Sequence, residues 1–234
     1  MKLGVICGME AEAKALGGLR RDPRLIVGIS AARPDRAEDL AREMIDADAM
    51  ALLSWGIAGG LAPGLASGTL VVPTAVTDAV QQNFALVRPT HLCDANDGQV
   101  FGSDHVIQTP EEKATLWHTT GAVAVDMETH RIARVAHHAA LPCLAIRAIS
   151  DVSTRALPPG TEDALDDEGK PRILPVLFGL MRDPSRLGAL LAAKRDLDTA
   201  LTTLSSQGVT VLKQILHQDL HQDARTGPAG PEQP

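Results

Sequence analysis

Apolar residues in the first 150 positions form short runs that alternate with amphipathic stretches. The runs predict β-strands at residues 3–7, 24–29, 50–55, 69–73, 122–125 and 143–149. Apolar positions three or four residues apart predict helices at residues 11–19, 35–45, 110–117 and 127–140. Strands that alternate with helices are typical of an α/β sheet with helices on both faces.

The remainder of the chain is less regular. Residues 77–109 contain many turn-forming residues, and two short strands are predicted there, near 100–101 and 105–107. A loop at 155–170 is followed by predicted helices at 172–181 and 185–204 and by a further turn or two at 208–217. From Gln218 onward the chain is polar and rich in glycine and proline. The sequence therefore predicts one domain over residues 1–217 and a disordered tail over 218–234.

Composition narrows the class of protein. The 234-residue chain is 44% hydrophobic, as in ordinary globular domains, and its net charge of −7 argues against a nucleic-acid partner. The longest apolar stretch, 173–181, is too short to span a membrane, and the apolar start is too short for a signal peptide. Because Cys7, Cys93 and Cys143 form no paired pattern, we expect a reduced, cytoplasmic protein without a metal site.

Three acidic residues stand where a ligand could reach them. Asp126 and Glu128 open a predicted helix, where capping is the simpler explanation for Asp126, while Glu128 could accept hydrogen bonds from two sugar hydroxyls. Asp151 ends an apolar strand, and ligands of open α/β sheets bind beyond the carboxyl ends of strands. A shielded carboxyl there could stay protonated and act as an acid, although an N-cap or an ion pair with Arg147 or Arg155 would also explain it.

Two further features follow the first and third strands. One of Glu10 and Glu12 is expected to be ordinary surface charge, whereas Glu12 could turn back toward the sheet edge and activate water. The glycine-rich segment 56–64 would let a ribose or phosphate approach backbone N–H groups, or it could simply form a tight turn. It matches neither a P-loop nor a dinucleotide-binding pattern. Tyrosine is absent, so a flat base would have to pack on few aromatic side chains or on walls such as Met9 and Met127.

Three blocks of sequence resemble one family, at residues 4–12, 56–63 leading to 68–72, and 126–151. In this order they are similar to the nucleoside phosphorylase and methylthioadenosine/S-adenosylhomocysteine nucleosidase superfamily. The resemblance implies a single-domain, three-layer, phosphorylase/hydrolase-like α/β fold with a mixed central sheet flanked by helices. It also implies cleavage of the N-glycosidic bond of an adenine nucleoside, with no cofactor and with a homodimer as the assembly.

Residues 155–159 and 182–196 resemble one branch, the hopanoid-biosynthesis-associated phosphorylase. That branch is understood to release adenine from adenosylhopane, a lipid-linked nucleoside. An apolar groove would then be needed, and apolar residues between 174 and 181 could line it, although plain core packing is the simpler explanation for most of them. A methylthioadenosine/S-adenosylhomocysteine nucleosidase or a general purine nucleoside phosphorylase is the alternative.

The resemblance assigns roles to individual residues. It makes Asp151 the acid at the purine N7, Glu128 the ligand of the ribose hydroxyls, and Glu12 the residue that positions water. The other contacts that it implies for the nucleoside are Met9, Ile57, Ala58, Gly59, Val106, Ile107, Met127 and Ser150. Val106 stands where the family often has an aromatic residue, which puts base stacking in doubt.

The attacking nucleophile stays open between water, which would make the enzyme a hydrolase, and phosphate as a co-substrate, which would make it a glycosyltransferase. Related phosphorylases use an arginine and a serine where this chain has Ser54 and Ile57, so Arg33, Arg36 and the amides near Gly8 are the remaining candidates for phosphate.

Two other classes compete with a nucleoside-cleaving enzyme. A non-catalytic nucleoside-binding protein would keep Glu128 without needing Asp151. A dinucleotide-dependent oxidoreductase is disfavoured by the glycine spacing.

Overall fold

The computed structural model describes residues 2–89, 96–157 and 187–223. The strands are β1 (Leu3–Cys7), β2 (Leu25–Ile29), β3 (Ala51–Gly60), β4 (Leu70–Val71), β5 (Ala75–Asp78), β6 (Asn83–Ala85), β7 (Gln99–Gly102), β8 (Ala124–Asp126) and β9 (Cys143–Asp151). The helices are α1 (Glu10–Ala15), η1 (Gly17–Arg21), α2 (Pro34–Asp46), α3 (Pro110–Thr120), α4 (Thr129–His138), α6 (Leu187–Thr203), η4 (Leu204–Gly208) and α7 (Val209–Asp223).

The described strands form one nine-stranded mixed sheet, with β3 at its centre. The path runs β2-β1-β3-β8-β7-β5-β6, and β9 pairs with both β3 and β4. β1, β2, β3 and β9 run parallel to their neighbours in this group, whereas β8 pairs antiparallel with β3. The predicted α/β fold with a mixed central sheet is confirmed.

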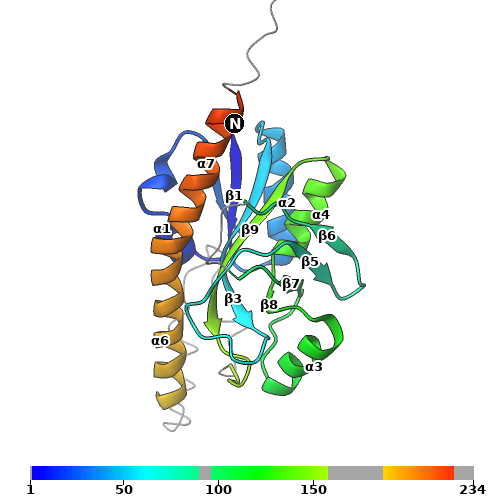
Figure 1. Cartoon of the computed structure of the whole chain (residues 1–234), viewed down its shortest axis with the longest axis vertical. Coiled ribbons are helices and arrows are strands. Elements are labelled where there is room, and N and C mark those ends of the chain that lie inside the picture. Colours follow the sequence, from blue (N-terminus) through cyan, green and yellow to red (C-terminus); the bar gives the residue numbers. More distant parts are fainter. Residues whose placement is uncertain (1, 90–95, 158–186, 224–234) are drawn as a thin grey trace, which may run out of the picture.

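Helices cover both faces of the sheet and make three layers (Figure 1). Alternate residues of β1 explain how: Leu3, Val5 and Cys7 face a core shared with α6 and α7, while Ile6 faces the core shared with α2 and α4. A smaller core lies beside β7 and β8, where Phe101 and Val125 pack against α3. Because successive side chains of a strand point to opposite faces, the apolar runs of the sequence bury both faces at once.

Several local predictions are wrong, each for a local reason. Residues 105–107 form a loop rather than a strand, because the Ser103 hydroxyl bonds both the N–H and the carbonyl of His105 and turns the chain. Strands β5 and β6 were not predicted, since each has only three or four residues. The first helix ends at Ala15 and continues as a 3₁₀ turn.

The C-terminal part also differs from expectation. The helix predicted at 185–204 is present as α6, but α7 is longer than a turn or two and runs to Asp223. Residues 218–223, predicted as part of the tail, belong to this helix, and the rest of the predicted tail lies outside the described residues. The helix predicted at 172–181 lies outside the described residues. Within the described residues, no helix combines the length and the apolar character that crossing a bilayer requires.

Candidate active site

The glycine-rich end of β3 is the centre of the candidate site. On one side, β3 pairs with β9 from Leu52, opposite Cys143, to Ala58, opposite Ile149. On the other side, Gly59 and Gly60 pair with β8. A side-chain carbon at Gly56 would lie 2.5 Å from Glu12 Oε1 and 2.6 Å from Arg147 Nη1. Only glycine leaves room for these two groups, so the glycine segment is a strand end that admits polar side chains rather than a simple turn.

Glu12 is buried in the first turn of α1 and is held by backbone donors. Its Oε1 accepts a hydrogen bond from the Ile57 N–H at 2.8 Å, and its Oε2 accepts one from the Met9 N–H at 2.8 Å. By contrast, Glu10 pairs with Arg20 at the surface, as expected for one of the two glutamates. The backbone contacts turn Glu12 toward the carboxyl end of β3, as predicted from the sequence.

Asp126 and Glu128 have different environments, although they are two residues apart. Asp126 Oδ1 accepts the N–H groups of Glu128, the N-cap residue of α4, and of Thr129, its first residue, at 3.1 and 2.9 Å, so Asp126 is not the N-cap but holds two donors at the start of the helix. Glu128 Oε1 instead lies 2.8 Å from the position that a side-chain carbon on Gly8 would take, and Glu12 Oε2 lies 3.3 Å from it. The carboxyl groups of Glu12 and Glu128 therefore both border the space that a side chain at Gly8 would fill.

Arg147 is a site residue that the sequence did not reveal as one. Its guanidinium is buried, with Nε 2.8 Å from Asp126 Oδ2, although this ion pair lacks the alignment of a hydrogen bond. Nη2 contacts the hydroxyls of Ser54 and Thr129 and, at 3.5 Å, Glu128 Oε2, while Nη1 donates to the Ile57 carbonyl at 3.4 Å. The signal for it in the sequence is a charged residue inside an otherwise apolar strand, which by itself indicates only a candidate ion-pair partner for Asp151.

The charges in this buried cluster are unbalanced. Three carboxyl groups, of Glu12, Asp126 and Glu128, surround the guanidinium of Arg147. Burial raises the pKa of Glu128 to about 8, opposed by Arg147 and assisted by the nearby carboxylates of Asp126 and Glu12. Burial also raises the pKa of Glu12, against the effect of Arg147 and three backbone donors. Either glutamate can therefore take up a proton far more readily than a solvated carboxylate can.

Asp151 lies across the end of β3 in a second buried environment. A register shift between Ala58 and Gly59 leaves Ser150 as the extra residue of β9, so Asp151 pairs with Gly59. Such bulges redirect the next side chain. Asp151 Oδ1 accepts the Ser150 hydroxyl at 2.7 Å, and Oδ2 forms an ion pair with the fully buried ammonium of Lys113. The predicted partners Arg147 and Arg155 are not used: Arg147 pairs with Asp126, and Arg155 with Asp196.

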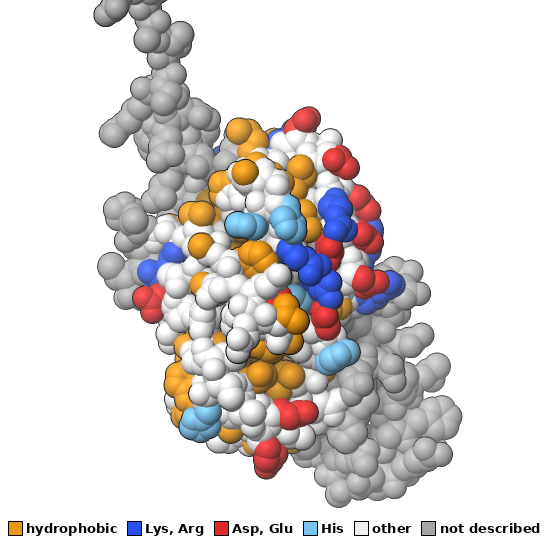
Figure 2. Space-filling view, turned by 90° about the vertical axis from the view of Figure 1, so that its right-hand side faces the viewer, with side chains coloured by type: hydrophobic (Ala, Val, Ile, Leu, Met, Phe, Trp, Pro, Cys, Tyr) orange, Lys and Arg blue, Asp and Glu red, His pale blue; other side chains and the backbone are white. Residues whose placement is uncertain are grey.

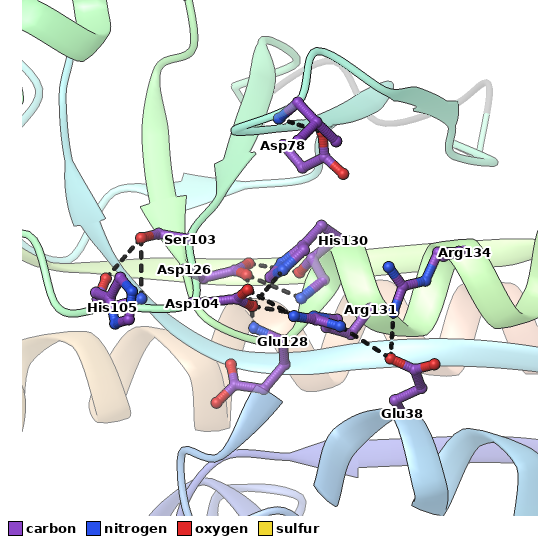
Figure 3. A network of polar contacts seen from close by, with 12 residues as sticks. Glu38, Asp78, Ser103, Asp104, His105, Asp126, Glu128, His130, Arg131 and Arg134 are labelled. Carbon is purple, nitrogen blue, oxygen red and sulfur yellow. Dashed lines mark hydrogen bonds and ion pairs between the residues drawn. The ribbon is translucent and has the colours of Figure 1, made fainter. Parts of the chain in front are cut away.

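A cleft of about 250 Å³ is lined by Asp104, His105, Val106 and Met127, the residue before Glu128 in the sequence. Asp104 anchors the loop that carries Val106, since it bonds His130 Nε2 at 3.0 Å and Arg131 Nε at 3.0 Å. Arg131 and Arg134 in turn contact Glu38 of α2 (Figure 3). Figure 3 also shows that Glu128 is directed away from these contacts.

The remaining predicted residues divide into two groups. Ile57, Ala58, Gly59 and Ser150 line the strand ends between Glu12 and Asp151, with the Ser150 hydroxyl 3.2 Å from the Ala58 carbonyl. Ile107 packs on the small core near α3, one residue beyond the cleft.

The two arginines proposed as phosphate ligands each form an ion pair with an exposed carboxylate. Arg33 pairs with Asp35, and Arg36 with Glu43, both on the exposed side of α2. On the face drawn in Figure 2, basic side chains lie among acidic ones. Among the described residues, no group of three His, Cys, Asp or Glu side chains could hold a metal ion.

Comparison with solved structures shows the same fold in known proteins. A 5′-methylthioadenosine/S-adenosylhomocysteine nucleosidase from Neisseria meningitidis is 19% identical, with a TM-score of 0.68 over 91% of this chain and 99% of the other. The Helicobacter pylori nucleosidase of that name is 16% identical, with a TM-score of 0.67 over 93% and 98%. A futalosine hydrolase of Helicobacter pylori is 17% identical, with a TM-score of 0.66 over 93% and 98%.

At the level of sequence, no curated protein matches the chain. The family model described as the Phosphorylase superfamily matches residues 28–170, more than half of the chain. The chain therefore belongs to the phosphorylase superfamily and is an enzyme of the nucleoside phosphorylase and nucleosidase class.

Proposed function

We propose that this protein cleaves the N-glycosidic bond of an adenine nucleoside and releases adenine, with water as the nucleophile. The observation that carries the proposal is that the carboxyl groups of Glu12 and Glu128 both lie next to Gly8, near the end of β3. Asp151, the last residue of β9, pairs with Gly59 at that same end of β3. Cleavage of a nucleoside requires a group that binds the sugar, one that activates the nucleophile and one that protonates the base. The three acidic residues can supply these functions.

The sugar is assigned to Glu128 and Met127. Glu128 accepts hydrogen bonds from the 2′- and 3′-hydroxyls, and Met127, which lines the neighbouring cleft, packs against the ribose. As the glycosidic bond breaks, positive charge develops on the sugar ring. The Glu128 carboxylate that remains after its proton is lost stabilises that charge in a site shielded from water.

The base is assigned to Asp151 and to the loop that carries Val106 and Ile107. The C1′–N9 bond breaks and leaves its electron pair on the base, while the Asp151 carboxyl gives its proton to N7. The water oxygen bonds to C1′, and its proton passes to Glu12. The backbones of Ile57, Ala58 and Gly59 border the path between the two acids, and Ser150 steadies Asp151.

Water is favoured over phosphate by the charge of the cluster. Among the described residues, the one guanidinium of the cluster is already shared by three carboxyl groups, so no unshared cation of the cluster is left to bind a phosphate dianion. Water would meet a carboxylate whose raised pKa suits it to accept a proton.

For the substituent at the 5′ carbon, we propose adenosylhopane as the first candidate, which makes the substrate lipid-linked. Its support is the resemblance of residues 155–159 and 182–196 to the hopanoid-associated branch. The segment expected to line an apolar groove, 174–181, lies outside the described residues. The second candidate is a nucleoside with a short 5′ group, as in the nucleosidases of similar fold.

The test is adenine release measured with and without phosphate, using adenosine derivatives with short and long 5′ chains. We expect equal rates in both buffers, free sugar rather than sugar 1-phosphate, and faster release from the long-chain substrates. The E12Q variant should be slower by about 10²–10⁴-fold. The matched control is E10Q, which changes a surface glutamate two residues away and should keep the rate.

Each outcome has a separate meaning. Release that requires phosphate and yields sugar 1-phosphate would overturn hydrolysis while keeping nucleoside cleavage. Faster release from the short-chain substrates would overturn the adenosylhopane assignment. A protein that binds adenine nucleosides without releasing adenine would overturn the enzymatic proposal.

The assembly is proposed from the resemblance alone. We propose a homodimer in which a neighbouring subunit completes the site. Sedimentation velocity would test this proposal, and a monomer that is fully active would overturn it.

A further inference from the structure

Lys113 is a fully buried lysine to which the proposed reaction gives no role. Lysine is among the residues least often buried completely, because an ammonium loses its hydration on burial. Here each of its donors has a partner: Asp151 Oδ2, the Val152 carbonyl at 3.1 Å and the Arg155 carbonyl at 2.9 Å. The lysine therefore binds α3 to the segment that begins with Asp151.

The position of Lys113 on α3 does not stabilise the helix by itself. Thr109 caps α3, and Glu112 bonds back to the Thr109 N–H at 2.9 Å, so the N-terminus is already closed. A positive charge near the N-terminus of a helix is disfavoured by the helix dipole. The favourable contacts of Lys113 are all with residues 151–155, and the Leu157 N–H donates to the Gln108 carbonyl at 2.9 Å beside them.

The Asp151 carboxyl is held at both of its oxygens. Lys113 contacts Oδ2, and the Ser150 hydroxyl donates to Oδ1 at 2.7 Å. On the β3 side stands Gly59, where even a side-chain carbon would lie 3.4 Å from Oδ2. The carboxyl is thus fixed in rotation by two neighbours and is bordered by a residue without a side chain.

We propose that Lys113 is a positioning residue that orients the Asp151 carboxyl toward the departing base. This inference rests on the proposed function. Proton transfer is efficient only at hydrogen-bond distance, and a displacement of about 1 Å can cost about 10²-fold in rate. When Asp151 gives its proton to the base, the adjacent ammonium also stabilises the carboxylate that remains.

The test compares two leaving groups on the same sugar. Adenine needs a proton to depart, whereas 4-nitrophenolate departs without one, so only adenine release depends on an oriented acid. In the K113M variant, adenine release should fall by about 10–100-fold. Release of nitrophenol from a 4-nitrophenyl riboside with the same 5′ group should stay within about twofold, because general acid assistance does not contribute to it.

The control is K194M, which removes the same charge from an exposed pair with Asp198 and should change neither rate. A K113M variant that loses both activities to the same extent, or loses neither, overturns the positioning role.

A double-mutant comparison covers the case in which K113M fails to fold because Asp151 is left as an unpaired buried charge. D151N and K113M/D151N both lack the Asp151 carboxylate, and in D151N the Lys113 ammonium keeps the Val152 and Arg155 carbonyls as partners. The two variants should release adenine at the same rate, since Lys113 acts only through Asp151. A further loss in the double variant overturns the proposal. Wild-type protein that releases no adenine from any adenine nucleoside would overturn the proposed function instead.

Discussion

The two buried acidic regions at the end of β3 differ in their balance of charge. On the side of Gly8 and Gly56, the carboxyl groups of Glu12, Asp126 and Glu128 share the guanidinium of Arg147. On the side of Gly59, Asp151 has an ammonium of its own, that of Lys113. In the first region, three carboxyl groups share one cation, whereas in the second, one carboxyl group pairs with one cation.

This difference shows that burial alone does not determine the state of a carboxyl group. Burial raises the pKa of Glu128 to about 8, with the shared Arg147 guanidinium opposing the rise and the neighbouring carboxylates of Asp126 and Glu12 adding to it. The charges within contact distance therefore change the effect of burial on a carboxyl group. The two regions can therefore be separated by experiments that change one charge at a time.

The largest effect is expected from Asp151. In the D151N variant, the amide cannot protonate the base, so adenine release should fall by about 10²–10⁴-fold while the protein stays folded. Adenine release and circular dichroism measure the two properties. The control D198N alters an exposed aspartate that pairs with Lys194. Near-normal turnover of folded D151N would refute the role of Asp151.

The next largest effect is expected from Arg147. The R147M variant leaves the buried carboxyls without their cation, and loss of one partner of a buried ion pair costs about 3–5 kcal/mol of stability. Urea unfolding at pH 7 measures the change. R36M, which breaks an exposed pair with Glu43, should change stability by about 1 kcal/mol or less. An equally small change in R147M would show that the cluster does not depend on its guanidinium.

The pH dependence of stability separates the regions further. Because the pKa of Glu128 is about 8 in the folded protein and 4.5 as its ordinary value, the folded state binds more protons between these values. Its stabilising effect is complete below about pH 4.5 and is lost as the pH rises through about 8. Each such proton contributes a slope of at most about 1.4 kcal/mol per pH unit.

Urea unfolding from pH 5 to pH 9 tests this prediction. The E128Q variant should flatten the decline relative to wild type, while E43Q, at an exposed carboxylate, should leave it unchanged. A wild-type stability that rises over this range would contradict the assignment.

The smallest effect is expected at the rim of the cleft. Hydrogen bonds from Arg131, with a smaller contribution from His130, lower the pKa of Asp104 to about 2. The D104N variant should loosen the loop that carries Val106 and raise KM by at most about fivefold, since partly exposed ion pairs contribute about 1 kcal/mol or less. kcat should not change. Steady-state kinetics of D104N measure both constants, with D39N, a substitution of an exposed residue of α2, as the control. A KM equal to that of wild type would show that Asp104 does not anchor the loop.

Local patterns predicted much of this molecule. The alternation of apolar runs and amphipathic stretches identified β1, β3 and β9, because strand and helix periodicities depend on neighbouring residues. The hydrogen bonds that Asp126 accepts at the start of α4 and the inward turn of Glu12 follow from contacts no more than a few residues away along the chain, together with one bond to Ile57.

Other features could not be predicted in this way. Lys113 belongs to a helix that contains several polar residues, and its burial depends on Asp151, 38 positions later. Arg147 meets the Ser54 hydroxyl across 93 positions. The bulge at Ser150 directs Asp151 away from Arg147, although the two residues belong to the same strand.

The amino-acid sequence by itself determined the alternation of strands and helices and placed acidic residues at the ends of three elements. Those properties arise from short-range backbone preferences and capping. Only the tertiary structure decided which acid shares Arg147 and which pairs with Lys113. Coulomb interactions in a buried site depend on distance in space, and that distance is set by packing between segments far apart in the chain.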